Sequence, residues 1–273
     1  MSRIGIIGAG AVGLLLASYL AEHHQITLYT RQLDDGTKRI LRDGQSSPTV
    51  KVRPIAHFES QDLVFVTTKS YDIKSVIPYL EHEKNPVVFL QNGMGHLDAA
   101  HALPQAIFGV VEHGAMKTGP YEIRHTGKGR IRYGNHLLSM LKRDALQFEH
   151  VTNIEAVMVT KLFMNAVINP LTAYYRVENG RLLEEPYASK ARAVFAEVQS
   201  VFPNHPITYD EIEQILQRTR LNRSSMLRDV EQGRMTEIDP IVGYVLKQAT
   251  QPTPLLTYYF QQIKHREQEG DSL

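Results

Sequence analysis

The chain has 273 residues, of which 42% are hydrophobic and 22% charged, so it resembles a soluble globular protein long enough for two domains. Its net charge of +1, with acids and bases interspersed, argues against a nucleic-acid or membrane-surface protein, because both usually carry a basic field. There are no cysteines, which excludes disulfides, thiolate metal sites and cysteine nucleophiles. No apolar run approaches the length of a membrane span, and the N-terminus lacks a signal-peptide pattern. We therefore expect a cytoplasmic protein.

A glycine-rich motif, GAGAVG, stands between a short apolar strand and a helical pattern at the N-terminus. Gly8 and Gly10 permit a tight turn and a close approach of the backbone to a pyrophosphate, and Gly13 lets the helix pack on the strand. Ala11 and Val12 belong to the helix N-terminus that receives the negative charge. The motif alone is weak, but its place between a strand and a helix favours a dinucleotide site over a purely structural glycine turn.

The next strand, residues 25–30, ends at Arg31. An acidic residue here would bond the 2′-hydroxyl of NAD, whereas an arginine pairs with the 2′-phosphate of NADP. Between the end of this strand and Asp34 there is no acidic residue, so NADPH is the expected cofactor; the alternative is a solvated arginine with Asp34 at the ribose. Lys69 follows the buried strand 63–68 and is expected either near the cofactor or as a solvated loop lysine.

A further strand, residues 86–90, ends in the run QNGMG. Asn92 in this run offers a donor and an acceptor at the expected level of the nicotinamide, and an ordinary asparagine–glycine turn explains the run equally well. Segments between residues 106 and 133 alternate with turn signals and predict an antiparallel extension of the sheet, followed by an amphipathic helix over residues 136–146. The histidines show no metal-ligand spacing, so we predict no metal.

The run from residue 153 to 175 is apolar in nearly every turn and predicts a buried helix. Lys161, Asn165 and Asn169 lie four residues apart in it, so they share one face. Burying that row without partners would cost several kcal/mol for the charge alone. Either the row lines a cleft where a ligand completes it, or the lysine reaches solvent and the asparagines bond the backbone.

The remainder of the chain is expected to be helical, so the fold class is α/β with a Rossmann-type dinucleotide-binding domain (1–152) and an all-helical domain (153–273). Ser225 and Glu237 stand near helix starts, where capping is the usual role. A buried lysine favours a carboxylate nearby, which makes Glu237 a candidate partner. The expected helices after the first are 187–201, 210–221, 224–231, 237–250 and 254–266.

Together these segments resemble the ketopantoate reductase (2-dehydropantoate 2-reductase) family. The resemblance spans almost the whole chain in order, through GAGAVG, Arg31, Lys69, QNGMG, KLFMNAVINPLTA and SSMLRDVEQGRMTEID. It implies an N-terminal Rossmann domain that binds NADPH and a C-terminal helical domain that binds the keto acid.

The resemblance also implies a role for each matched residue. Lys161 would be the general acid, Asn165 and Asn169 would bond the hydroxyl and carbonyl groups of the substrate, and Ser225 would bond its carboxylate. Glu237 would hold the substrate hydroxyl and help position the lysine. The cofactor would be contacted by Gly8, Gly10, Ala11, Val12, Gly13, Arg31, Lys69 and Asn92, the last of which would also reach the substrate.

The expected activity is therefore the NADPH-dependent reduction of 2-dehydropantoate to pantoate, in pantothenate and coenzyme A synthesis. The nearest alternative is a 2-hydroxy-acid dehydrogenase that acts on branched 2-keto acids with NADPH or NADH, and a more distant one is a non-catalytic NADP-binding sensor. Arg31 favours NADPH, while Asn169 and Glu237 offer groups that recognise the additional hydroxyl of ketopantoate. We expect a small-molecule keto acid substrate, no nucleic-acid or membrane partner, and a monomer or homodimer.

Overall fold

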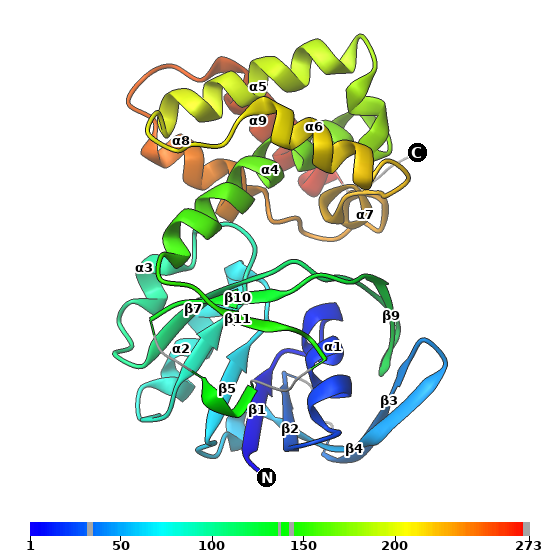
Figure 1. Ribbon diagram of the computed structural model, residues 1–273, viewed down its shortest axis with the longest axis vertical. Coiled ribbons are helices and arrows are strands. Elements are labelled where there is room, and N and C mark those ends of the chain that lie inside the picture. Colours follow the sequence, from blue (N-terminus) through cyan, green and yellow to red (C-terminus); the bar gives the residue numbers. More distant parts are fainter. Residues whose placement is uncertain (32–34, 136–137, 142–144, 270–273) are drawn as a thin grey trace. The chain divides into compact units, whose positions relative to one another are not determined.

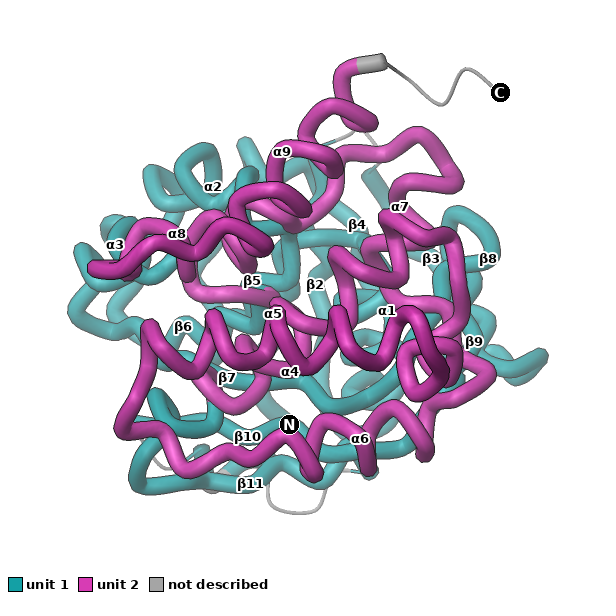
Figure 2. The backbone as a smooth tube through the Cα atoms, turned by 90° about the horizontal axis from the view of Figure 1, so that it is seen from above, with its two compact units in different colours: residues 1–91, 96–157 teal, residues 92–95, 158–273 magenta. Residues whose placement is uncertain are grey.

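The computed structural model describes residues 1–31, 35–135, 138–141 and 145–269, and its chain forms two compact units (Figure 1, Figure 2). Unit 1 comprises residues 1–91 and 96–157, and unit 2 comprises residues 92–95 and 158–273. The short segment 92–95 therefore belongs to unit 2, although the segments on both sides of it belong to unit 1.

Unit 1 is built on a parallel sheet. Ile4 lies in register between Ile26 and Leu63 of the two neighbouring strands, and all three side chains are buried. The strand order is that of a doubly wound dinucleotide-binding fold, which confirms the α/β prediction. The parallel strands lie in the order β4 (Gln45–Pro54), β2 (Gln25–Thr30), β1 (Arg3–Ile7), β5 (Leu63–Val66), β6 (Val87–Phe89) and β7 (Ala106–Val111).

The order of the strands reverses between β1 and β5. On one side of this point, the helix α1 (Ala11–Leu20) leads from β1 to β2. On the other side, α2 (Ile73–Leu80) leads from β5 to β6, and α3 (Leu97–Ala100) leads from β6 to β7. Ligands of open parallel sheets bind at such a reversal, outside the carboxyl ends of the strands. The glycine-rich loop follows β1 at this place, and residues 67–69 follow β5.

Additional strands extend the sheet at both ends, and the antiparallel pairing predicted after residue 106 is confirmed for β8–β9 and for β10 against β7. The strand β7 itself is parallel to β6, because it is the last strand of the doubly wound order. The additional strands are β11 (Phe148–His150) and β10 (Ile131–Tyr133) beyond β7, and β3 (Gly36–Arg42), β9 (Glu122–Gly127) and β8 (Gly114–Gly119) beyond β4.

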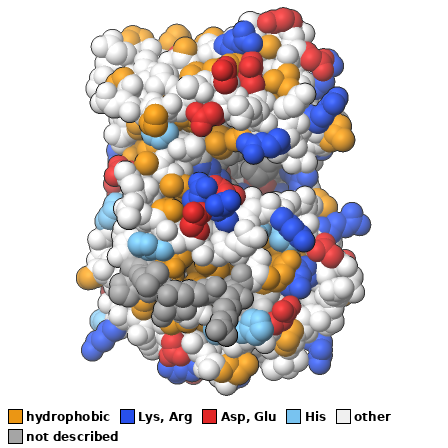
Figure 3. Space-filling view, in the orientation of Figure 1, with side chains coloured by type: hydrophobic (Ala, Val, Ile, Leu, Met, Phe, Trp, Pro, Cys, Tyr) orange, Lys and Arg blue, Asp and Glu red, His pale blue; other side chains and the backbone are white. Residues whose placement is uncertain are grey.

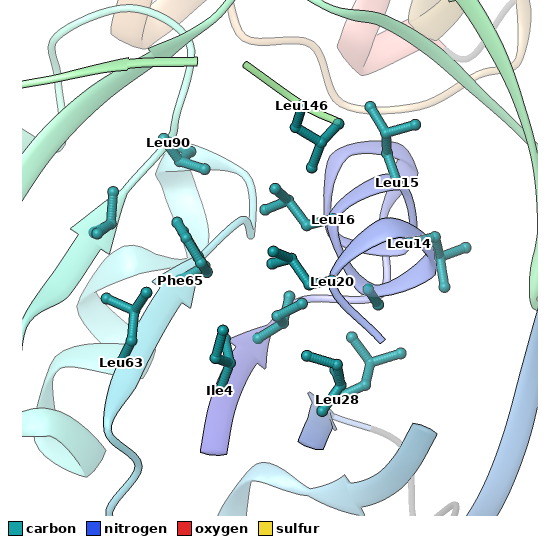
Figure 4. Close-up of a cluster of buried hydrophobic side chains, with 14 of the residues drawn as sticks. Ile4, Leu14, Leu15, Leu16, Leu20, Leu28, Leu63, Phe65, Leu90 and Leu146 are labelled. Carbon is teal, nitrogen blue, oxygen red and sulfur yellow. The ribbon is translucent and has the colours of Figure 1, made fainter. Parts of the chain in front are cut away.

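The helix α1 is enclosed by this extended sheet, because β3, β8 and β9 pack on it as well as β1 and β2 (Figure 1). Leu14, Leu15 and Leu16 are consecutive, so they point to different sides of the helix, as Figure 4 shows. All three are nevertheless buried. The apolar character of α1 on every side thus follows from its position between two layers of strands.

The amphipathic helix predicted for residues 136–146 is wrong in the part that the structure describes. Residues 136–137 and 142–144 of that range lie outside the described residues, and the rest holds a 3-10 turn at Ser139–Leu141. Asn135 and Gln147 have φ of +67° and +52°, so the chain bends sharply on either side. Leu138, Leu141 and Leu146 are buried in the core of unit 1, although none of them lies in an α-helix.

Unit 2 is helical, as predicted. The helix expected at 210–221 ends earlier, and the one expected at 237–250 contains a π-helical turn, Asp239–Gly243. Pro240 has no amide hydrogen, and its carbonyl accepts a hydrogen bond from Met94 N at 2.9 Å, which favours a widened turn here. The helices are α4 (Ile154–Tyr175), whose first residues belong to unit 1, α5 (Tyr187–Val201), α6 (Tyr209–Arg218), α7 (Ser225–Glu231), α8 (Tyr244–Gln248) and α9 (Pro254–Glu269).

The helix α4 is long and apolar enough to cross a membrane, contrary to the expectation that no segment approaches that length. However, 67% of its most apolar window is buried inside the structure, so α4 is a core helix.

Figure 3 shows acidic and basic side chains interspersed over the face in view.

Candidate active site

The glycine-rich loop has no room for side chains at two of its three glycines. Gly8 has φ of +113°, and a Cβ on it would lie 2.9 Å from Thr68 N. A Cβ on Gly13 would lie 1.9 Å from the carbonyl oxygen of Gly8. In contrast, a Cβ built on Gly10 would have no atom of the described residues within 4 Å, apart from those of its neighbours in the chain. The loop is thus closely packed at Gly8 and Gly13 and open at Gly10, as the approach of a pyrophosphate requires.

The N-terminus of α1 opens at this loop, and no side chain caps it at Gly10. Ala11 and Val12 form the first turn, so their amide groups and the helix dipole favour an anion here. Lys117 adds a positive charge, because its Nζ donates a hydrogen bond to the carbonyl of Ala9 at 2.8 Å. Burial lowers the pKa of Lys117 from its usual value. Sequence reasoning missed this lysine, which β8 brings to the loop from 108 residues away.

Two buried polar atoms at the same sheet edge have no hydrogen-bond partner among the described residues: Thr68 Oγ1 and Gln91 Oε1. The amide nitrogen of Gln91 is satisfied, since it donates to the carbonyls of Val66 at 2.9 Å and Thr68 at 3.1 Å. Buried polar atoms normally find partners, so these two suit a polar ligand at the carboxyl ends of β5 and β6. With the open glycine and the uncapped helix, they fit a dinucleotide.

Arg31 and Lys69 both lie at this edge, as predicted from their places after β2 and β5. Arg31 forms an ion pair with Asp72, at 2.8 Å. Asp72 belongs to the turn that Lys69 begins, since Asp72 N donates to the Lys69 carbonyl at 3.0 Å. The structure thus places beside Arg31 a carboxylate that the sequence did not indicate, and the pairing of Arg31 with a phosphate stays a prediction.

In unit 2, α4 carries Lys161, Asn165 and Asn169 in one continuous helix. The four-residue spacing aligns the three side chains along one face. Lys161 and Asn165 are half-buried, whereas Asn169 is buried. The row is therefore more exposed at its lysine end.

Asn92 and Glu237 meet within unit 2, where Asn92 Nδ2 donates to Glu237 Oε2 at 3.0 Å. The glycine after Asn92 makes this contact possible, because Gly93 has φ of +69° and a Cβ on it would lie 2.2 Å from the Pro240 carbonyl oxygen. Glu237 is 5% exposed. The asparagine–glycine run is thus a turn, as one of the two alternatives has it, and this turn also brings the Asn92 amide to Glu237.

The backbone beside Glu237 is held by α9. Both the amide and the hydroxyl of Thr236 donate to Glu267 Oε1 at 2.7 Å, and Thr236 is fully buried. Lys264 Nζ lies 2.9 Å from both Glu267 and Asp239. No sequence motif marked Glu267, which comes from the last helix.

Ser225 is the exposed first residue of α7. The neighbouring Ser224 is the buried N-cap, whose Oγ accepts hydrogen bonds from Leu227 N at 3.0 Å and Thr172 Oγ1 at 2.8 Å. Thr172 lies on α4, three residues after Asn169. The structure therefore joins α7 to α4 through Ser224 and leaves Ser225 accessible. Among the residues it describes, no group of three or more His, Asp or Glu is suited to hold a metal.

Two family models match most of the chain. One, described as Ketopantoate reductase PanE/ApbA, matches residues 4–137, and the other, described as Ketopantoate reductase PanE/ApbA C terminal, matches residues 153–267. The chain belongs to the ketopantoate reductase family. It is accordingly an oxidoreductase of that family, with an N-terminal sheet domain and a C-terminal helical region.

The 2-dehydropantoate 2-reductase of Bacillus subtilis (strain 168) is 35% identical over 270 residues, which cover 91% of this chain and 91% of that protein. The crystal structure of a probable 2-dehydropantoate 2-reductase from Bacillus subtilis has a TM-score of 0.85 and 33% identity to this ketopantoate reductase family member, and the match covers 97% of this chain and 100% of that one.

More distant structures show the likeness of the fold alone. A dimeric ketopantoate reductase from Staphylococcus aureus has a TM-score of 0.82 at 20% identity, covering 98% of this chain and 99% of that one. A D-mandelate dehydrogenase in complex with NADH and anilino(oxo)acetate has a TM-score of 0.85 at 20% identity, with coverage of 98% and 99%. Proteins with this fold thus differ in substrate.

Proposed function

We propose that this protein is a cytoplasmic NADPH-dependent 2-dehydropantoate 2-reductase that forms pantoate for pantothenate and coenzyme A. The observation that carries the proposal is the buried carboxylate of Glu237 bonded to Asn92, in the unit that also holds the polar face of α4. A relative of that name, 35% identical, supports the choice of substrate. We assign NADP binding to residues 1–152 and substrate binding and catalysis to residues 153–273.

In this proposal Lys161 is the general acid. The bound cofactor would supply a hydride to the keto carbon and be left as NADP⁺, so negative charge would develop on the carbonyl oxygen. The Lys161 ammonium donates a hydrogen bond to that oxygen and then transfers a proton, so a C–H and an O–H bond form while the C=O π bond is lost. The amine regains its proton from solvent.

The remaining polar groups recognise the substrate. Glu237 accepts a hydrogen bond from the terminal hydroxyl of ketopantoate, and Asn165 and Asn169 bond the hydroxyl and carbonyl oxygens. Ser225 donates to the carboxylate, which its exposure at the start of α7 allows. A substrate without the terminal hydroxyl would leave the buried Glu237 carboxylate without that donor, which is a severe penalty for a polar recognition site.

The test is a comparison of ketopantoate with 3,3-dimethyl-2-oxobutanoate, which lacks only the terminal hydroxyl, by NADPH oxidation. We expect kcat/KM to be at least about 100-fold higher for ketopantoate, because the site is built to bond a hydroxyl. Equal values for the two acids would overturn the proposal in favour of a branched 2-hydroxy-acid dehydrogenase. NADPH binding without turnover of either acid would instead indicate a sensor.

A further inference from the structure

Arg31 and Asp72 form an ion pair across the end of β1. Arg31 follows β2, and Asp72 closes the turn after β5, with Arg31 Nη1 2.8 Å from Asp72 Oδ1. Since β2 and β5 are the two neighbours of β1 in the sheet, the pair joins segments on both sides of the glycine-rich loop. It therefore lies beside the place where the adenosine ribose of a dinucleotide binds in this fold.

The two partners differ in exposure: the side chain of Arg31 is 73% exposed, whereas that of Asp72 is 15% exposed. A carboxylate with so little contact to solvent requires hydrogen-bond donors or positive charge nearby. Its side chain makes no capping hydrogen bond to α2, so the start of that helix does not explain its position. The contact that the structure shows for this carboxylate is its ion pair with Arg31.

A carboxylate and a guanidinium at this place select opposite cofactors. The carboxylate accepts a hydrogen bond from the 2′-hydroxyl of NADH, whereas the guanidinium pairs with the 2′-phosphate of NADPH. A phosphate that bonds Arg31 here also comes within about 6 Å of Asp72, a separation at which like charges still repel measurably.

We propose that Asp72 is the specificity-determining residue for the cofactor. It bonds the adenosine ribose of NADH and weakens the binding of NADPH at Arg31, so the protein binds NADH as well as NADPH. This inference rests on the proposed function, because it assumes that the protein binds a nicotinamide cofactor at Arg31. In a partly exposed site, two unit charges at this separation change a dissociation constant by about tenfold.

The test is Asp72→Asn, which keeps the size of the side chain and removes its charge. The Kd values of NADPH and NADH are measured by nicotinamide fluorescence without any keto acid. We expect Kd for NADPH to fall about tenfold and Kd for NADH to rise, and we expect the gain for NADPH to shrink at high salt.

A matched control exists at the amino ends of β1 and β5, on the opposite edge of the parallel sheet. Arg3 begins β1 and pairs with Asp62, just before β5, at 3.2 Å. Asp62→Asn changes the net charge equally and should leave the ratio of the two Kd values unchanged. A second variant, Arg31→Gln, tests the pair if Asp72→Asn does not fold: it should weaken NADPH binding and spare NADH.

The outcomes separate this inference from the proposed function. A wild-type Kd ratio in Asp72→Asn, or an equal loss of both cofactors in Arg31→Gln, would overturn the role of Asp72 and leave the reductase proposal standing. A wild-type protein that binds neither cofactor would overturn both.

Discussion

The carboxylate of Glu237 accepts a hydrogen bond from Asn92 at 3.0 Å, although 145 residues separate the two in the chain. The contact depends on Gly93 and Gly95, where Cβ atoms would lie 2.2 Å from the carbonyl oxygen and 3.0 Å from the Cα of Pro240. The short segment 92–95, between β6 and α3, thus becomes part of the helical unit and brings an amide to a buried acid.

Replacing Glu237 by Gln should remove the charge and keep the shape of the side chain. If the carboxylate holds the substrate hydroxyl, kcat/KM for ketopantoate should fall by about 100-fold, whereas that for 3,3-dimethyl-2-oxobutanoate should change little. Steady-state kinetics with both acids measure the difference. Equal losses for the two acids would show that Glu237 acts without contact to the hydroxyl.

Replacing Lys161 by Ala should lower kcat by about 100-fold or more, because no group then gives a proton to the developing alkoxide. The Kd of NADPH should change only slightly. Lys161→Arg separates charge from proton transfer, since arginine keeps the cation but does not release a proton near neutral pH. Lys190→Met, which alters a lysine of α5, is the control. Unchanged turnover in Lys161→Ala would remove the lysine from the mechanism.

Replacing Thr236 by Val should test how α9 positions Glu237. The change keeps the shape of the side chain and the amide hydrogen bond to Glu267, but removes the hydroxyl bond of 2.7 Å to Glu267 and the bond of 3.1 Å that the hydroxyl accepts from Ile238 N. We expect a loss of about 1–3 kcal/mol in unfolding free energy, because a buried carboxylate oxygen loses a donor. A positioning role also requires kcat/KM for ketopantoate to fall more than that for its hydroxyl-free analogue. Loss of stability alone, with wild-type discrimination, would make the contact purely structural.

The contrast between Arg31 and Asp72 shows how far the sequence led. The place of Arg31 follows from a local pattern, a strand with a basic residue at its end, and the structure bears out that placement. Its partner lies 41 residues further on, and they meet only because β2 and β5 flank β1. Lys117 at Ala9 and Glu267 at Thr236 are further cases in which tertiary packing, absent from any motif, supplies the partner.

Local patterns also failed where packing replaced periodicity. The leucines at positions 138, 141 and 146 suggested a helix, yet they fill the core of unit 1 from a turn and the segments beside it. Similarly, the helix expected at 237–250 widens to a π-helical turn at Pro240. The carbonyl of Pro240 accepts a hydrogen bond from Met94 N, which lies outside this helix. In both places the chain adapts to neighbours distant in the sequence.

His96 follows the QNGMG run and is 2% exposed, and neither of its ring nitrogens has a hydrogen-bond partner among the described residues. Its ring packs against Phe89 and Phe108, with centroids 6.4 Å and 6.0 Å away. Burial, and to a lesser degree the charge of His101, lowers the pKa of His96 from 6.5 to about 4. The imidazole is therefore neutral in the folded protein at any pH near neutrality.

This depressed pKa should make the protein sensitive to acid. Above pH 6.5 the ring is neutral in both the folded and the unfolded chain, so its titration does not change the unfolding free energy. As the pH falls from 6.5 to about 4, only the unfolded chain takes up the proton, and the unfolding free energy should fall by about 3 kcal/mol. Urea unfolding of His96→Phe over this range should lack that share of the slope, whereas the exposed control His82→Asn should keep it. An identical slope in His96→Phe and the wild type would show that His96 is not held neutral by the fold.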